Sequence, residues 1–285
     1  MDAGPAVQRA LRHVARLSAG PPIDPRSRVT VNFHPDRPTR DGLLVVEALA
    51  RDGVYRSQFV TGTSNGGLTA HPGGDRWVWE QRLFGGAYDD EPVELRPVYG
   101  TLDFRADPAG GAPRFGSAHL RLGAAVLRRT TFCHPDSVFA PTDFGVAERM
   151  GLVALAEARR PQDPLDDYIE AHVHGPVRLD RDVEAIVLDP AHRGTAVEAA
   201  AARLGCPVRW HPGFRLTVAE LRRHPDYRGP QHTALEAELA VDGVLDPRIL
   251  GAAWRSGRHD AQDLKRVWHL LARFGRPGRR GNGLR

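Results

Sequence analysis

A segment that could bind a polar ligand lies between residues 54 and 67. It begins with β-branched and aromatic residues and then changes to small hydroxyl, amide and glycine residues. We predict a strand over 54–60 and then a loop, in which hydroxyls and backbone N–H groups could hold ribose or phosphate oxygens. The loop residues concerned are Thr61, Thr63, Ser64, Asn65 and Gly66. Because Asn-Gly is a strong turn dipeptide, a tight turn without a ligand is the alternative.

A second candidate lies on a strand predicted over 168–173. Alternate residues of a strand share a face. One face of this strand carries Tyr168, Glu170, His172 and His174. The residues between them are small and apolar, and should face a core. This pattern predicts a strand that lines a cleft, with Glu170 as the catalytic carboxylate; a solvated strand face is the alternative.

The same strand raises the question of a metal. His-x-His on a strand is a known zinc geometry, but His172 and His174 supply only two ligands. A third ligand would have to come from His34, Asp189 or His192, and the spacing favours none of these residues. We therefore predict no metal site, and keep a metal-dependent hydrolase as an alternative.

Further candidates lie at the ends of predicted elements. His34 directly follows a strand predicted over 29–33, and the hydroxyl loop should lie near the end of that strand. Arg37 and Arg56 could pair bidentately with a pyrophosphate.

Two tyrosines could stack on a flat ring. Tyr99 precedes a glycine that allows close approach, although an aromatic core residue followed by a turn is the simpler interpretation; Tyr88 is the second candidate. The P-loop, the dinucleotide fingerprint and the Gly-x-Ser-x-Gly elbow are absent. Ser64 could be a nucleophile, but no base is tied to it by spacing.

The bulk composition indicates a globular chain. A length of 285 residues fits one large domain or two small ones, and a hydrophobic content of 41% is enough for a core. The net charge of +4 is too modest to argue for nucleic acid. Cys133 and Cys206 are far apart, and we expect both to be buried thiols in a reducing compartment. With no apolar leader and no membrane span, we expect a cytoplasmic protein without a membrane partner.

The order of predicted elements indicates an α+β body over 1–190, with a mixed or antiparallel sheet, and a mainly helical part over 191–285 that packs on it. The predicted strands are 29–33, 54–60, 93–99, 102–105, 118–122, 130–133, 168–173, 183–188 and 208–210. The predicted helices are 5–17, 41–51, 77–83, 146–160, 195–204, 218–223, 233–240, 247–254 and 260–274. We expect residues 107–113 to form an exposed loop and the arginine-rich residues after 273 to be a disordered tail.

Several segments together resemble an uncharacterised bacterial family, a domain of unknown function. They are residues 31–37, 58–66, 83–88, 96–100 and 168–175. This resemblance covers most of the chain and brings no known activity.

The order of motifs is also similar to the catalytic core of ADP-ribosyltransferases. There a first strand ends in Arg or His, a second carries a Phe-x-Ser-Thr-Ser-like motif, and a later strand carries a glutamate. The matching positions are His34 or Arg37, then 59–64, then Glu170. Two departures stand out: 61–64 lacks the strict hydroxyl triplet, and Tyr168 stands where that family has Glu or Gln.

This resemblance implies a sheet of ADP-ribosyltransferase type and an enzyme that consumes NAD, as a transferase or a glycohydrolase. Glu170 would stabilise the positive charge on the ribose, with Ser64 and His34 beside it in the catalytic set. NAD would contact Arg37, Arg56, Thr61, Thr63, Asn65, Gly66 and Tyr99. The acceptor stays open: protein, nucleic acid, small molecule or water. A metal-dependent hydrolase and a non-enzymatic binding protein, which could be toxin-associated, are the alternatives.

Overall fold

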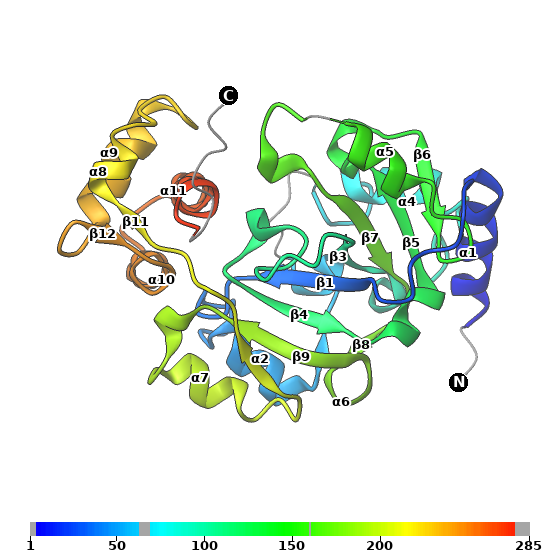
Figure 1. The fold of residues 1–285 in the computed structure, drawn as a ribbon. Helices are drawn as coiled ribbons and strands as arrows, with labels where there is room; N and C mark the ends of the chain where they lie inside the picture. Colours follow the sequence, from blue (N-terminus) through cyan, green and yellow to red (C-terminus); the bar gives the residue numbers. More distant parts are fainter. Residues whose placement is uncertain (1–3, 63–68, 160, 277–285) are drawn as a thin grey trace.

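The computed structural model describes residues 4–62, 69–159 and 161–276, and its centre is an eight-stranded sheet. The strand order is β10-β9-β4-β1-β3-β7-β5-β6, as Figure 1 shows. Every neighbouring pair is antiparallel except β9 and β10, which are parallel. The strands are β1 (Arg28–Phe33), β3 (Val98–Asp103), β4 (Ala118–Leu122), β5 (Thr130–His134), β6 (Asp143–Val146), β7 (Ile169–Val173), β9 (Val183–Leu188) and β10 (Val208–Trp210). The α+β prediction with a mixed, mostly antiparallel sheet is confirmed.

Two short ribbons lie outside this sheet. β2 (Val54–Tyr55) pairs with β8 (Val177–Arg178), and β11 (Leu216–Thr217) pairs with β12 (Val244–Leu245). The helices are α1 (Pro5–Leu17), α2 (Val45–Asp52), α3 (Gln58–Thr61), α4 (Asp75–Leu83), α5 (Leu152–Ala158), α6 (Leu179–Asp182), α7 (Ala196–Ala201), α8 (Val218–Leu221), α9 (Pro230–Leu239), α10 (Pro247–Ser256) and α11 (Ala261–Phe274). The 3₁₀ turns are η1 (Val93–Leu95), η2 (Pro113–Phe115), η3 (Ala124–Arg129), η4 (Ser137–Phe139), η5 (Pro164–Asp166) and η6 (Pro190–His192).

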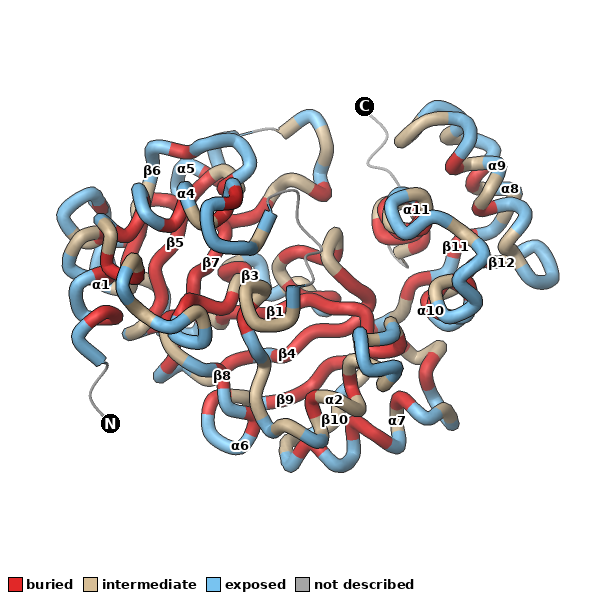
Figure 2. The backbone as a smooth tube through the Cα atoms, turned by 180° about the vertical axis from the view of Figure 1, so that it is seen from behind, coloured by how far each residue is buried: buried red, intermediate tan, exposed pale blue. Residues whose placement is uncertain are grey.

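The two faces of the sheet differ in chemistry because its strands alternate apolar and polar residues. One face packs against α2, α5 and α7 and forms the main hydrophobic core. Its strand residues include Val29, Val31 and Phe33 of β1 and Ile169, Ala171 and Val173 of β7. The strands are the most buried part of the chain (Figure 2).

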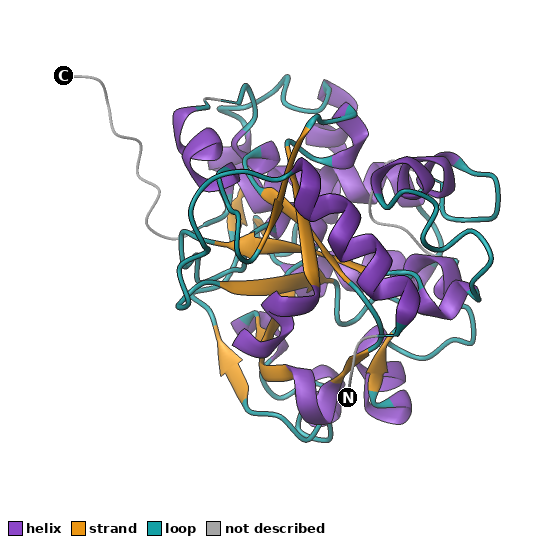
Figure 3. Cartoon of the chain, turned by 90° about the vertical axis from the view of Figure 1, so that its right-hand side faces the viewer, coloured by secondary structure: helices purple, strands orange, loops and turns teal. Residues whose placement is uncertain are grey.

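The opposite face carries polar side chains in register. Thr30 of β1 pairs with Thr101 of β3, which pairs with Glu170 of β7, which in turn pairs with Cys133 of β5. All four residues are buried. Helices α1 and α4 cover this face near β6, where α1 contacts the edge strand (Figure 3).

The predicted strand over 54–60 is wrong. Only Val54 and Tyr55 form a strand, and they pair with β8 rather than with the main sheet. Residues Gln58–Thr61 instead form the helical turn α3, which ends at Gly62 in the left-handed conformation (φ 61°). Glycine has no Cβ and adopts this conformation without strain, so it stops the turn.

Other predicted boundaries also shift. The edge strand β6 was not predicted, and the helix predicted over 146–160 is confined to α5. The strand predicted over 93–99 begins with the turn η1, and its end merges with 102–105 into β3. The prediction of an exposed loop over 107–113 is wrong, because Asn32 donates from Nδ2 to the carbonyl of Ala109 and holds this segment against β1. Most of the predicted arginine-rich tail, from residue 277 onward, lies outside the described residues.

The helices α8 to α11 form a second hydrophobic cluster beside the sheet (Figure 1). Trp268 of α11 is fully buried and donates from Nε1 to the carbonyls of Pro113 and Arg114, both at 3.0 Å. Arg255 of α10 donates to the backbone carbonyl of Asp36 at 2.9 Å. These contacts dock the C-terminal helices on the end of β1. Within the described ranges, every helix is too short or too polar to cross a lipid bilayer.

Candidate functional site

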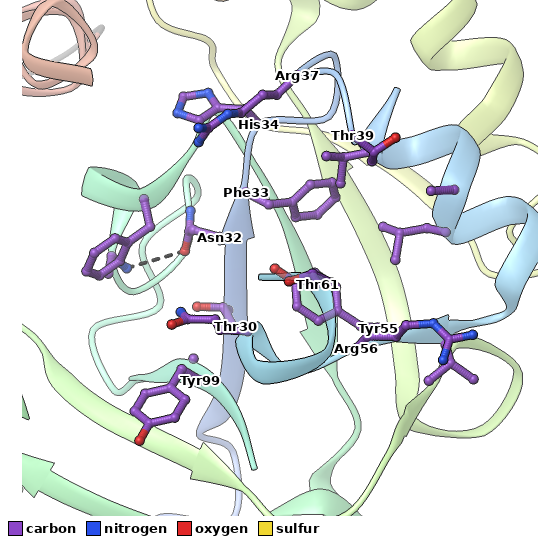
Figure 4. A pocket seen from close by; sticks show the side chains of 18 of the residues that line it. Thr30, Asn32, Phe33, His34, Arg37, Thr39, Tyr55, Arg56, Thr61 and Tyr99 are labelled. Carbon is purple, nitrogen blue, oxygen red and sulfur yellow. Dashed lines mark hydrogen bonds between the residues drawn. The ribbon is translucent and has the colours of Figure 1, made fainter. Parts of the chain in front are cut away.

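A cavity of about 350 Å³ opens where β1 and β3 separate. β1 pairs with β3 only through Arg28–Thr30, whereas Asn32 and Phe33 pair with β4 alone. The cavity therefore runs along the edge of β1 that β3 leaves (Figure 4). Its walls come from β1, β2, β3, β7, α2, α3 and α4, from the turns η2 and η4, and from the segments that adjoin these elements.

This cavity collects six of the predicted site residues. They are His34, Arg37, Arg56, Thr61, Tyr99 and Glu170, and Figure 4 labels all of them except Glu170. The other four predicted residues, Thr63, Ser64, Asn65 and Gly66, lie outside the described residues. Thr61 lies at the end of α3 and lines the cavity.

Glu170 lies on β7 and is only 6% exposed, at the wall of the cavity. Its Oε1 accepts a hydrogen bond from Nε2 of His172 at 3.0 Å, and its Oε2 accepts one from the hydroxyl of Ser137 at 3.1 Å. Burial alone would raise the pKa of Glu170, but His172, the charge of Arg76 and Ser137 together lower that pKa below its ordinary value. The carboxylate is therefore ionised at neutral pH.

A chain of buried hydrogen bonds continues behind Glu170. His172 contacts the hydroxyl of Thr131 through Nδ1 at 3.2 Å, and Thr131 contacts Nε2 of His174 at 3.0 Å. Nδ1 of His174 lies 2.7 Å from the hydroxyl of Tyr88. Burial lowers the pKa of His174 well below its ordinary value, so this ring is neutral. The strand face is thus a buried network, and the alternative of a solvated face is wrong.

A second carboxylate lies beside the first. Asp136 also lines the cavity, and Ser137 links the two acids because its hydroxyl lies 3.5 Å from Oδ1 of Asp136 as well as 3.1 Å from Glu170. The hydroxyl of Tyr168 donates to the other Asp136 oxygen. Burial, reinforced by the charge of Glu170, raises the pKa of Asp136 to about 6. The two carboxyl groups therefore have pKa values that are pushed apart.

The aromatic and basic wall is built around Tyr99. Its hydroxyl donates to Oε1 of Glu80 at 2.9 Å, and the guanidinium of Arg76 lies over its ring at 4.0 Å. Glu80 forms a fully buried ion pair with Arg96 at 2.8 Å. Tyr88, the other tyrosine predicted to stack on a ligand, is instead buried behind His174, and that prediction is wrong.

The remaining predicted residues lie at the mouth and the far end of the cavity. His34 packs between Trp254 and Trp268, with ring centroids 4.6 and 4.7 Å away, and burial lowers its pKa well below the ordinary value. Arg37 lies over the ring of Trp254 at 5.7 Å. Arg56 is exposed at the rim, where its Nε donates to Asp52 at 3.1 Å.

The histidines and the aspartate that were candidate metal ligands do not come together in one site. Both nitrogens of His174 have hydrogen-bond contacts, with Tyr88 and Thr131. Asp189 accepts from the backbone N–H groups of Ala191 and Phe214. Across the part of the chain that the structure describes, the one group with metal-like spacing is a different set, made of Cys133, Glu170 and His172.

Four residues at this site were given no functional role from the sequence. Arg76 looks like any arginine on a helix, and no pattern distinguishes it from a surface residue. Asp136 and Ser137 follow one of several His-Pro pairs, which are common at turns. Cys133 was expected to be a small buried residue, and it is buried, but its Sγ lies 3.8 Å from Oε1 of Glu170.

The fold and the site together define an α+β protein with a ligand-sized cavity where β1 and β3 of its sheet separate. The model of a family described as "Protein of unknown function (DUF3626)" matches residues 28–158 and 151–274. The chain belongs to this family, which confirms the resemblance to an uncharacterised family. The matches run from β1 to the end of α11, so the family includes both the sheet and the C-terminal helices. No curated protein matches the chain.

Proposed function

We propose that this protein cleaves the nicotinamide–ribose bond of NAD, as an ADP-ribosyltransferase or an NAD glycohydrolase, on a fold of ADP-ribosyltransferase type. The observation that carries the proposal is the ionised Glu170 in a cavity that it shares with Thr61, Tyr99 and His34. A cavity of about 350 Å³ suits the nicotinamide and its ribose.

Glu170 has the position and charge that this chemistry needs. Breaking the bond builds positive charge on the ribose ring, as in glycoside cleavage. A fixed carboxylate in a site with little water stabilises that charge strongly. The hydrogen bonds from His172 and Ser137 fix the orientation of the carboxylate before the substrate binds. The nicotinamide of NAD carries a positive charge and leaves as a neutral molecule, so its departure requires no acid.

Asp136 supplies the base for the second half of the reaction. An acceptor hydroxyl or a water must lose a proton as it attacks the ribose, and a base with a pKa near 6 is largely deprotonated at pH 7. Tyr168 stands where the related pattern has Glu or Gln, and its hydroxyl donates to Asp136. Asp136 therefore brings a carboxylate close to residue 168, although it comes from a different segment of the chain.

The proposal is tested by incubating the purified protein with NAD and measuring released nicotinamide. Glu170→Gln keeps the shape of the side chain but removes its charge and replaces one of its two acceptor oxygens with a donor. We expect it to lower the rate about 10³-fold or more while the affinity for NAD changes little. No release by the wild-type protein, with water or a range of acceptors, contradicts the proposal.

A metal-dependent hydrolase is a second candidate, favoured by the group of Cys133, Glu170 and His172. Their ligand atoms are 3.0 to 3.9 Å apart. Four-coordinate zinc with bonds of roughly 2.0–2.3 Å has its ligands about 3.3–3.8 Å apart. Stoichiometric zinc in the purified protein, lost in Cys133→Ser, would favour this candidate. Metal-free protein that releases nicotinamide in the presence of a chelator would favour NAD cleavage.

A further inference from the structure

Arg76 occupies an unusual position on α4, at the wall of the cavity. It is only 3% exposed, yet its side chain lines the cavity together with Tyr99 and Glu170. Its guanidinium lies over the ring of Tyr99, 4.0 Å from the centroid. This contact holds the guanidinium in place and leaves its edge directed away from the ring.

Several N–H groups of Arg76 have no hydrogen-bond acceptor among the described residues. Among the described residues, neither Nε nor Nη1 of Arg76 has a hydrogen-bond partner, although both atoms are buried. The neighbouring buried arginine, Arg96, differs because both of its terminal nitrogens, Nη1 and Nη2, donate to Glu80 and to the carbonyl of Tyr88. Only its Nε is without a partner among the described residues. Buried N–H groups without acceptors destabilise a fold, so their presence at a cavity wall indicates a ligand that supplies the acceptors.

We propose that Arg76 is the centre of an anion-binding site that takes a phosphate group of a ligand in the cavity. Nε and Nη1 together offer three N–H groups, and a tetrahedral phosphate presents several oxygens to such donors. Gln58 of α3 lines the same cavity, and its amide oxygen also has no partner among the described residues. Rotation of this amide presents its N–H₂ group to the same anion.

The neighbouring charged groups affect both the charge of Arg76 and the binding of an anion to it. Burial by itself would lower the pKa of Arg76, but Tyr99, Glu170 and Glu80 outweigh it, so the guanidinium stays charged. Glu170 both lines the cavity and acts on Arg76. An anion at Arg76 is therefore repelled by Glu170 and attracted by Arg76, and the two side chains should have opposite effects on its binding.

The experiment is calorimetric titration of the full chain with pyrophosphate at fixed ionic strength. Arg76→Gln should weaken binding at least about tenfold, the size expected for charged hydrogen bonds. Arg82→Gln is the matched control, since it removes the same charge from an exposed position on the same helix. It should leave the affinity within about twofold. Glu170→Gln should strengthen binding, because it removes the repelling charge. Equal affinities for wild-type and Arg76→Gln protein, or no binding by either, overturn the proposal.

A second measurement avoids the variant, should Arg76→Gln fail to fold. Crystals of the wild-type protein soaked in tungstate, a heavy phosphate-like anion, should show it within hydrogen-bonding distance of Arg76 Nε or Nη1. Tungstate that binds only at other positions contradicts the assignment. Acetate that binds at Arg76 in a separate soak would show a site for carboxylates instead. This inference does not rest on NAD cleavage: a protein that binds pyrophosphate at Arg76 but releases no nicotinamide keeps the anion site and loses the proposed function.

Discussion

The two faces of the central sheet are built from the same strands but differ in how their buried side chains are stabilised. On β7, Ile169 and Ala171 pack into the main core, whereas Glu170 and His172, which alternate with them, point to the polar side. β1 repeats the arrangement, with Val31 in the core and Thr30 at the cavity. Both faces are buried, so the difference is not exposure but whether burial is satisfied by apolar contact or by hydrogen bonds.

This difference between the faces predicts which property a substitution on each face will change. Apolar burial is non-directional, and its loss lowers stability wherever it occurs. The polar face depends on direction and charge, because each of its groups holds the next: Thr131 holds His172, which holds Glu170. Variants on the two faces should therefore separate stability from activity.

The largest effects come from neighbours on β7. Ile169→Ala should lower the free energy of unfolding by about 2–4 kcal/mol and leave the rate per folded molecule unchanged. Glu170→Gln should do the opposite, with a rate loss of about 10³-fold or more and a small change in stability. Urea unfolding and nicotinamide release measure the two quantities. Equal losses of activity in both variants would argue that Glu170 is only structural.

The next effect concerns Asp136. Because a base must be deprotonated to act, the wild-type rate should rise as pH increases through about 6 and then level off. Asp136→Asn should lower the plateau about a hundredfold and remove this rise. The pH–rate profile from about pH 4.5 to about pH 8.5 tests it. A profile unchanged in Asp136→Asn would assign the base to another residue.

A smaller effect of Asp136 appears in stability. Its pKa is about 6 in the folded protein against an ordinary value of 3.8, so the folded state holds this proton more tightly. The stability it contributes is fully present below pH 3.8 and is lost as pH rises through about 6. Asn does not titrate, so Asp136→Asn should gain about 2–3 kcal/mol relative to the wild type between about pH 4 and about pH 7. A pH-independent difference between the two proteins would be at odds with this account.

The smallest expected effect lies behind the site. Thr131→Val keeps the shape of the side chain but removes the hydroxyl between His172 and His174. We expect a loss of about 1 kcal/mol in stability and a roughly two- to fivefold lower rate, with the dependence on pH retained. Phe132→Leu, on the opposite face of the same strand, is the control and should change stability only. A rate unaffected by Thr131→Val would restrict the positioning role to His172 and Ser137.

Much of the sheet could be predicted from alternation alone. The strands at 29–33, 118–122, 183–188 and 208–210 are confirmed within a residue, and so is the division of residues 168–174 into a polar and an apolar side. These predictions succeeded because side-chain period follows directly from strand geometry. His34, Tyr99 and Glu170 meet at one cavity because β1, β3 and β7 are neighbours in the sheet, an order that alternation does not predict.

What could not be predicted depends on contacts between distant segments. α3 is a single turn between Ser57 and Gly62, too short for a helical period to show among residues that also favour strands. Arg76 gains its meaning only from burial against Tyr99, and Asp136 only from its place beside Tyr168. Such pairings arise from tertiary packing, which spacing along the chain does not contain.

The most direct measurement is a crystal structure of the Glu170→Gln variant with NAD, in which the missing charge preserves the substrate. We predict that the nicotinamide and its ribose occupy the cavity between β1 and β3, with the ribose 2′-hydroxyl within hydrogen-bonding distance of the amide that replaces the Glu170 carboxylate. NAD bound away from this cavity, or absent from it at millimolar concentration, would contradict the claim that this cavity is the active site.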